Sequence, residues 1–242
     1  NHHCGFGAVQ ALSSVDNNHL ENGFVAMDQG AELSAPGVTV YVLDRILDVT
    51  QRVMDLRGEV QDDSQRLLKT QQAIRAIEEE AEETYPDSEC TVEEYFEGRE
   101  YALQIKTRIP DVRLVYAPPR SIGEFGGDVD NWEWPRHTGD FTFFRAYVGP
   151  DGKPAPFSED NVPYEPKHYL KVSTAGVQDG DIAVIMGYPG NTQRCKTSAI
   201  VGLRETFTYP VRNELLTAAI DVLKRAGEGS EELALQLTTP IK

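Results

Sequence analysis

The sequence of 242 residues contains little cysteine, with only Cys4, Cys90 and Cys195. Three cysteines are too few for the disulfide framework that holds many small secreted domains together. An odd number allows one pair with a residue left over, or a partner in sequence that this chain does not include. Long apolar runs are also missing. No stretch approaches the roughly twenty apolar residues of a membrane span, and the 40% apolar composition is that of a globular protein.

Basic residues are scarce as well. The 23 Lys and Arg are outnumbered by 39 Asp and Glu, which gives a net charge of −16 and argues against a nucleic-acid-binding surface. Part of the acidic excess lies in Glu78-Glu79-Glu80-Ala81-Glu82-Glu83. Such a run is typical of a solvated helix face rather than of an acidic recognition patch.

The chain is long enough for one large domain or two modest ones. It begins at Asn1 without an initiator Met, inside a motif, so no signal peptide can be read and export is not excluded.

The first half of the sequence predicts strands interrupted by a helical hairpin. Pro36-Gly37 followed by residues 38–43 reads as a turn and a β-strand. Apolar residues then recur at spacings of three and four, as on one face of a helix. Tyr85-Pro86 ends this pattern, because proline cannot continue a helix. We therefore expect a helical hairpin over residues 44–84, set into a β domain.

The second half predicts more strands and then helices. Strand patterns occur at residues 101–105, 112–116, 140–148, 169–172 and 181–186. Helices are expected over 210–226, with Pro210 in the first turn, and over 230–238, started by Ser230-Glu231-Glu232. The sequence predicts a mainly β domain with α insertions over residues 1–190, and the start of an α-helical domain over 191–242.

His3 and Asp140 are candidate catalytic residues. Activation of a serine hydroxyl needs an imidazole base and a carboxylate that orients it, and here a His precedes an Asp in the chain. Asp128 and Asp130 are rivals to Asp140 that spacing does not exclude. A zinc site at His2-His3-Cys4 is disfavoured, because adjacent side chains on an extended segment point to opposite faces.

Both tryptophans of the chain lie within Asn131-Trp132-Glu133-Trp134. Buried Trp usually belongs to a core, yet polar groups beside aromatic walls also suit the capture of a peptide end. The glycines of Gly187-Tyr188-Pro189-Gly190 lack the lysine and hydroxyl residue of a phosphate-binding loop, so this segment is interpreted as a structural turn.

Three strings together resemble the S46 family of bacterial peptidases, which includes dipeptidyl peptidases 7 and 11. They are Asn1-His2-His3-Cys4-Gly5, Gly123 through Asp140, and Met186-Gly187-Tyr188-Pro189-Gly190. The resemblance covers essentially the whole chain, and the string Asp130-Asn131-Trp132-Glu133-Trp134-Pro135-Arg136-His137-Thr138-Gly139-Asp140 is its most specific part.

The resemblance implies a trypsin-like double β-barrel with an inserted α-helical domain, of which this chain holds most of the first barrel. It implies that His3 is the catalytic base, that Asp140 is the triad carboxylate, and that Asn131 and Trp132 bind the free N-terminal amine of a peptide. It further implies release of dipeptides in the bacterial periplasm or at the cell surface, with no metal or cofactor. Peptides are the expected partners, a homodimer is one allowed assembly, and neither nucleic acid nor a membrane span is expected.

The family's nucleophile motif, a Gly-Asn-Ser-Gly-Ser type string, does not occur here. Ser121, Ser158, Ser173 and Ser198 lack the glycine context of an oxyanion hole. The nucleophile is therefore expected outside this chain, as is the disulfide partner of Cys4, and the isolated chain is expected to be inactive. Two alternatives stay open: a trypsin-like endopeptidase, and a non-catalytic binding module of the same fold.

Overall fold

The computed structural model describes residues 5–130, 133–184 and 195–241. These residues divide into two compact units, Asn1–Tyr164 and Glu165–Lys242, and each is described by itself. Within the described residues, no helix combines the length and apolar character needed to cross a membrane.

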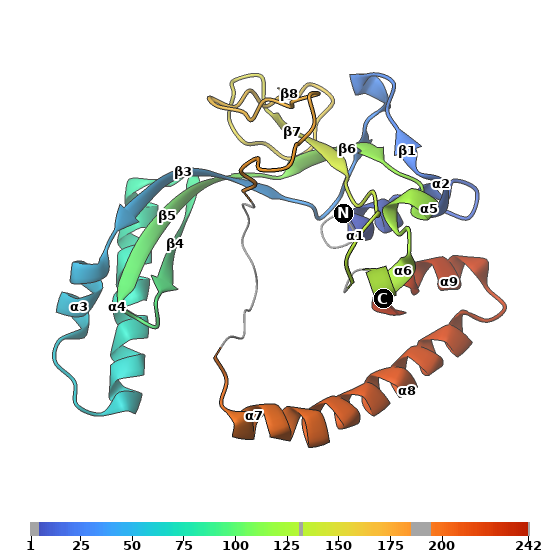
Figure 1. Cartoon of the computed structure of the whole chain (residues 1–242). Helices are drawn as coiled ribbons and strands as arrows, with labels where there is room; N and C mark the ends of the chain where they lie inside the picture. Colours follow the sequence, from blue (N-terminus) through green and yellow to red (C-terminus); the bar gives the residue numbers. More distant parts are fainter. Residues whose placement is uncertain (1–4, 131–132, 185–194, 242) are drawn as a thin grey trace. The chain divides into compact units, whose positions relative to one another are not determined.

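The first unit contains a three-stranded antiparallel sheet in the order β3 (Val40–Asp48), β5 (Glu100–Ile109) and β4 (Ser88–Tyr95) (Figure 1). Helices α3 (Thr50–Arg57) and α4 (Asp63–Thr84) pack on this sheet. The core between helices and sheet is apolar and includes completely buried Val53 and Ile77. Its other buried members are Val49, Ala73, Ala81, Cys90, Tyr101, Leu103 and Ile105.

The helical hairpin is present, but its predicted start at residue 44 is wrong. Strand β3 continues to Asp48, because residues 45–48 pair with residues 102–105 of β5 after an irregularity near Asp44. Val49 and Val53 do face the core, as the spacing indicated, whereas Ile46 is 57% exposed. Pairing with β5 thus overrides the helical spacing over its first residues.

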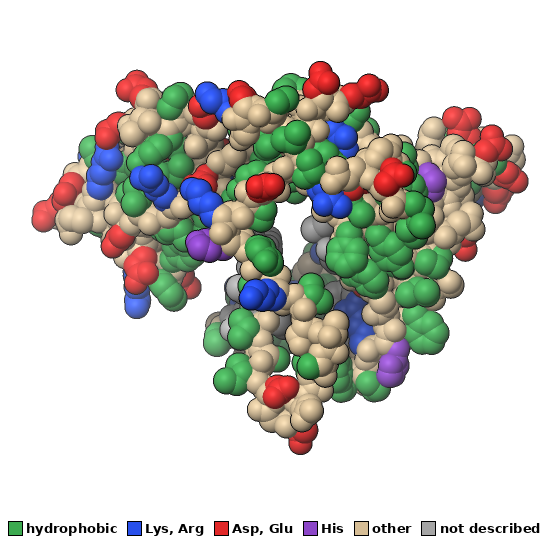
Figure 2. Space-filling view, turned by 90° about the horizontal axis from the view of Figure 1, so that it is seen from above, with side chains coloured by type: hydrophobic (Ala, Val, Ile, Leu, Met, Phe, Trp, Pro, Cys, Tyr) green, Lys and Arg blue, Asp and Glu red, His purple; other side chains and the backbone are tan. Residues whose placement is uncertain are grey.

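Helix α4 ends where the sequence indicated. The Asp62 side chain accepts a hydrogen bond from the Gln65 N–H at 2.9 Å and caps its start, and the helix ends at Thr84 before Tyr85-Pro86. Glu79, Glu80, Glu82 and Glu83 are exposed, which confirms the prediction of a solvated acidic face. On the molecular face drawn in Figure 2, acidic side chains are scattered, with apolar side chains exposed among them.

The second sheet of this unit is curled and antiparallel, with β6 (Asp111–Ala117) at its centre. Pro110 separates β6 from β5, so the chain passes from one sheet to the other at a residue that has no N–H for a ladder. On one side of β6 lie β1 (Phe24–Val25) and β2 (Leu33–Ser34). On the other side lies β7 (Phe143–Val148), followed by β8 (Val162–Pro163).

Short helices lie beside this curled sheet. They are α1 (Phe6–Ala11), α2 (His19–Asn22), the 3-10 turn η1 (Gln29–Ala31), α5 (Arg120–Gly123) and α6 (Gly127–Asp130). The first unit is thus a β structure with α elements, as predicted. Its strands form a half-barrel of curled antiparallel sheet.

The described residues of the second unit are mainly helical. They form α7 (Ser198–Leu203), the π-turn η2 (Arg204–Thr208), α8 (Tyr209–Gly227), α9 (Glu231–Gln236) and α10 (Thr238–Ile241). Pro210 lies in the first turn of α8 and Ser230 caps α9, which confirms both predicted helix starts; α9 ends at Gln236, two residues before the predicted end. Residues 169–172 and 181–184 form no strand, contrary to prediction; residues 185 and 186 of the second predicted strand lie outside the described residues. Their apolar side chains are at least 74% exposed, so no neighbouring strand or core favours the extended form. The predicted domain boundary at residue 190 lies outside the described residues.

Candidate active site

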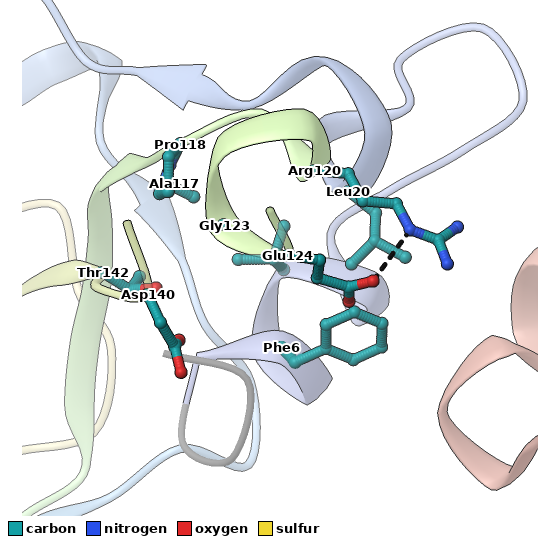
Figure 3. A pocket seen from close by; sticks show the side chains of 10 residues that line it. Phe6, Leu20, Ala117, Pro118, Arg120, Gly123, Glu124, Asp140 and Thr142 are labelled. Carbon is teal, nitrogen blue, oxygen red and sulfur yellow. Dashed lines mark hydrogen bonds and ion pairs between the residues drawn. The ribbon is translucent and has the colours of Figure 1, made fainter. Parts of the chain in front are cut away.

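Asp140 lines a pocket beside the curled sheet. It lies between α6 and β7, and with Thr142 it forms one wall of the pocket (Figure 3). Phe6 and Val9 of α1 contribute apolar surface, and Arg120 and Glu124 contribute charged groups. The remaining lining residues are Leu20, Ala117, Pro118 and Gly123. The candidate carboxylate therefore faces a concave surface that combines apolar and ionic groups.

An ion pair fixes the α5 side of the pocket. Arg120 Nε donates to Glu124 Oε2 at 3.0 Å, one helical turn away, as the dashed line in Figure 3 marks. A second contact, 3.8 Å from Arg120 to Glu21 Oε2, links α5 to α2. The Arg120 side chain is 46% exposed, so each of these ion pairs is expected to contribute about 1 kcal/mol or less to stability.

Three hydrogen bonds hold the backbone on either side of Asp140. The Gly139 N–H donates to the Ile122 carbonyl at 3.0 Å. The Thr138 hydroxyl donates to the Phe125 carbonyl at 2.8 Å. The Phe141 N–H donates to the Gly139 carbonyl at 3.1 Å, which makes Asp140 the central residue of a three-residue turn.

The same contacts explain why the predicted strand over 140–148 begins only at Phe143. The segment before it is bonded to α5 and its following turn instead of to a neighbouring strand. The backbones approach closely there: a Cβ at position 139 would lie 2.7 Å from Ile122 Cγ2 and would force that exposed side chain to move. Phe141 stacks on Tyr116 with ring centroids 5.5 Å apart, which ties the segment to β6.

A second close approach fixes the end of β6. Gly23 has φ +76°, and a Cβ there would lie 2.7 Å from Pro119 N and 2.8 Å from the Ala117 carbonyl oxygen. Only glycine fits this conformation and this space without strain. The loop after α2 therefore packs directly against the chain that leads into α5.

The other predicted site residues fall partly outside the described part of the chain. His3, Asn131 and Trp132 lie outside the described residues, as do Cys4 and Gly187–Gly190. Their roles stay predictions. Asp128 and Asp130, the rivals of Asp140, belong to α6.

Sequence reasoning missed a buried polar network inside the curled sheet. Arg113 donates to both carboxylate oxygens of Asp111, at 3.2 and 2.8 Å, and Asn161 Nδ2 donates to the same carboxylate at 2.9 Å. The guanidinium lies over the Tyr147 ring, 3.7 Å from its centroid. Asp111 and Arg113 at i and i+2 of a strand share one face, a signal that was available. Asn161 is fifty positions away and gave no such signal.

The network alters two ionisation equilibria. Burial alone would raise the pKa of Asp111, but hydrogen bonds from Arg113 and Asn161 outweigh burial and lower it. Burial, together with the hydrogen bond that the Tyr147 hydroxyl donates to Glu32 Oε2 at 2.8 Å, raises the pKa of Tyr147 to about 12. Strands β6 and β7 are thus joined by buried charged groups that have hydrogen-bonding partners within the fold.

Of the described cysteines, Cys90 is buried and Cys195 exposed, and both are free thiols. Burial, and then the nearby Glu82 and Glu78, raise the pKa of Cys90, so its thiol is neutral at physiological pH. The disulfide predicted for Cys4 stays untested. In the described part of the chain, no group of three or more His, Cys, Asp and Glu side chains is placed to hold a metal ion.

Comparison with known proteins gives consistent relatives. Residues 1–241 match the Peptidase S46 family. The chain is 44% identical over 200 residues to dipeptidyl-peptidase 7 of Porphyromonas gingivalis, covering 82% of this chain and 28% of that protein. It is also 44% identical over 223 residues to the Asp/Glu-specific dipeptidyl-peptidase of Flavobacterium psychrophilum, covering 92% of this chain and 31% of the relative.

A solved structure agrees. The crystal structure of Porphyromonas endodontalis DPP11 in complex with the dipeptide Arg-Glu matches with a TM-score of 0.84 and 37% identity, over 100% of this chain and 35% of that one. The chain therefore spans about a third of the length of these relatives. The match over nearly all its residues shows that this chain belongs to the Peptidase S46 family.

Proposed function

We propose that the protein containing this chain is a serine-type dipeptidyl peptidase that removes dipeptides from the free N-terminus of peptides. The observation that carries the proposal is family membership over residues 1–241, joined to Asp140 on the wall of a pocket. In the proposed mechanism His3 is the general base, and Asp140 orients its imidazole and stabilises the imidazolium that forms. The serine nucleophile is proposed to lie in sequence beyond this chain.

The fixed backbone around Asp140 supports an orienting role. A triad carboxylate must hold the imidazole in one tautomer and one direction, which requires a carboxylate of fixed position. Asp140 is the centre of a tight turn with hydrogen bonds on both sides, and its carboxylate lies beside the apolar surface of α1. Helix α1 begins three residues after His3, and its first residue, Phe6, lines the same pocket as Asp140. The proposed base is therefore close in sequence to one wall of the pocket, and the proposed carboxylate is part of another.

Selection for dipeptides needs a group that holds the substrate's α-ammonium at a fixed distance from the scissile bond. We assign this role to Asn131, whose side-chain carbonyl can accept from an ammonium, and to Trp132, which closes the subsite. The names of the relatives favour a dipeptidyl peptidase over an endopeptidase, because both relatives are dipeptidyl peptidases. A trypsin-like first barrel and a periplasmic or cell-surface location belong to the same proposal, as does inactivity of residues 1–242 alone.

The test uses the full-length protein and a chromogenic dipeptide substrate with a free or an acetylated amine. We expect the acetylated substrate to be cleaved poorly. Asp140→Asn should lower kcat by about four orders of magnitude, because the imidazole loses its orienting carboxylate. Asp151→Asn, a change to an exposed turn aspartate that keeps an acceptor oxygen, is the matched control and should leave turnover unchanged.

Two results would contradict the proposal. Equal cleavage of free and acetylated substrates would replace the dipeptidyl reaction with an endopeptidase reaction. Near-normal turnover by Asp140→Asn would remove Asp140 from the triad and leave Asp128 and Asp130 as the carboxylates to test next.

A further inference from the structure

Thr138 and Gly139 close a loop immediately before Asp140. Two pairs of residues meet across it: Ile122 with Gly139, through the backbone, and Phe125 with Thr138, through the threonine hydroxyl. The members of the second pair are thirteen positions apart in the chain. Both hydrogen bonds therefore hold the backbone immediately before Asp140.

The two hydrogen bonds differ in what they require. The bond from the Gly139 N–H to the Ile122 carbonyl joins two backbone groups and needs no particular side chain at position 139. The 2.8 Å bond to Phe125 needs a side-chain hydroxyl at position 138. Thr138 is therefore the side chain whose chemistry determines whether this second bond forms.

The α5 end of the closure is itself anchored. The Glu124 N–H donates to the Arg120 carbonyl at 2.8 Å, and the Gly127 N–H donates to the Glu124 carbonyl at 2.9 Å, so the chain that carries the Phe125 carbonyl is folded into consecutive turns. The Arg120 side chain joins Glu124 to Glu21 of α2. The bond from Thr138 to this segment restricts the backbone at position 138, and Asp140 follows two residues later.

We propose that Thr138 is a positioning residue for Asp140: its hydroxyl fixes the loop closure that sets the direction of the proposed triad carboxylate. This inference rests on the proposed function. Phe125 is 55% exposed, so water can replace the lost donor at its carbonyl and the folded state loses little stability. The backbone two residues before Asp140, however, loses one of the bonds that hold it. The expected effect is therefore on the chemical step.

The decisive variant is Thr138→Val in the full-length protein, which removes the hydroxyl and keeps the shape. We expect kcat on a free-amine dipeptide substrate to fall about tenfold with KM within about twofold, because displacement of a catalytic group penalises the chemical step. The acid limb of the pH–rate profile should move to lower pH, since a displaced carboxylate stabilises the imidazolium less. Thr138→Ser, which keeps the hydroxyl, should restore both.

Thr84→Val is the matched control. The Thr84 hydroxyl also donates to a backbone carbonyl, that of Glu80 at 3.0 Å, but on α4 beside the other sheet. This variant should leave kcat and the pH profile unchanged. If Thr138→Val does not fold, Thr138→Ala supplies the same comparison with less steric demand.

The inference is overturned if Thr138→Val keeps its kcat, or if kcat falls only in proportion to a loss of folded protein with no change in the pH profile. It is also overturned if Thr138→Ser behaves like Thr138→Val. Asp140→Asn in the same assay separates the two proposals. An inactive Asp140→Asn with a normal Thr138→Val removes the role of Thr138 alone, whereas an active Asp140→Asn removes the proposed triad.

Discussion

The two sheets of the first unit differ in what they bury. The three-stranded sheet buries an apolar cluster against α3 and α4, centred on Val53 and Ile77. The curled sheet also buries apolar side chains, such as Val112 and Leu114, but it adds a buried charged pair: Asp111 is 1% and Arg113 8% exposed, and each has partners within the fold. The candidate site lies at the curled sheet.

Apolar contacts and charged hydrogen bonds constrain a structure in different ways. Apolar contacts stabilise without direction, so they define a position only through shape. Charged hydrogen bonds have fixed geometry and are costly when broken, so they hold strands β6 and β7 in one arrangement. A site that must hold a carboxylate in a given direction benefits from the second kind of core.

The largest effect on stability is expected from Arg113→Leu. It leaves the Asp111 carboxylate buried without its cation, which costs about 3–5 kcal/mol of unfolding free energy. Urea unfolding of the full-length protein measures this change. Arg52→Leu is the matched control, because its ion pair with Glu80 is exposed and such pairs are worth about 1 kcal/mol or less. Equal costs for the two variants would contradict the comparison between the sheets.

A somewhat smaller effect is expected from Ile77→Ala in the apolar core. The side chain is completely buried, and its truncation leaves a cavity that costs about 2–4 kcal/mol. The loss should be the same at pH 5 and pH 8, because no charge changes. Leu67→Ala, on the same helix but 62% exposed, should cost far less in the same unfolding experiment. A strong pH dependence of the Ile77→Ala loss would show that the cluster is coupled to ionisable groups.

The smallest effect concerns alkaline pH. The pKa of Tyr147 is raised to about 12 in the folded protein from an unfolded value of 10.0, so the folded state holds the proton more tightly. Its contribution is therefore complete below pH 10 and is lost as pH rises toward 12, by an amount on the order of 2 kcal/mol. Tyr147→Phe should flatten this loss in unfolding measured from pH 9 to pH 12.

Tyr101 provides the comparison within the other sheet. Burial, and then the nearby Glu94, raise its pKa as well. Tyr101→Phe should leave the part of the alkaline loss that belongs to Tyr147 in place. If Tyr147→Phe shows the same alkaline slope as the unmodified protein, the network around Glu32 and Arg113 does not control the pH response.

Local signals predicted what local physics determines. The end of α4 followed from Pro86, and the starts of α8 and α9 followed from Pro210 and Ser230, because these residues act within one turn of the helix. The extension of β3 to Asp48 could not be read, since it depends on a partner strand more than fifty positions away. The strands predicted after residue 165 did not form in the described residues. The sequence pattern of a strand is present there, but no partner strand lies among the described residues.

The site shows the same division. Asp140 could be proposed from its motif, but two of the three hydrogen bonds that hold its backbone join residues more than ten positions apart and needed the structure. The Asp111–Arg113 alternation was visible as two charges on one strand face. Its meaning depended on Asn161 and Tyr147, which the chain brings together only on folding.

The pairing of β6 with β7 contains one further consequence. Leu114 faces Phe144 and Tyr116 faces Phe143, so β6 advances two residues where β7 advances one. The extra residue, Val115, turns the strand and resets which side chains beyond it face each side of the sheet. The number of residues in β6 therefore determines on which face of the sheet Ala117 and Pro118 lie, and in which direction the following turn begins. Deleting Val115 would leave every motif of the family intact. It would nevertheless turn the pocket-lining residues Ala117 and Pro118 to the opposite face of the sheet relative to Asp140.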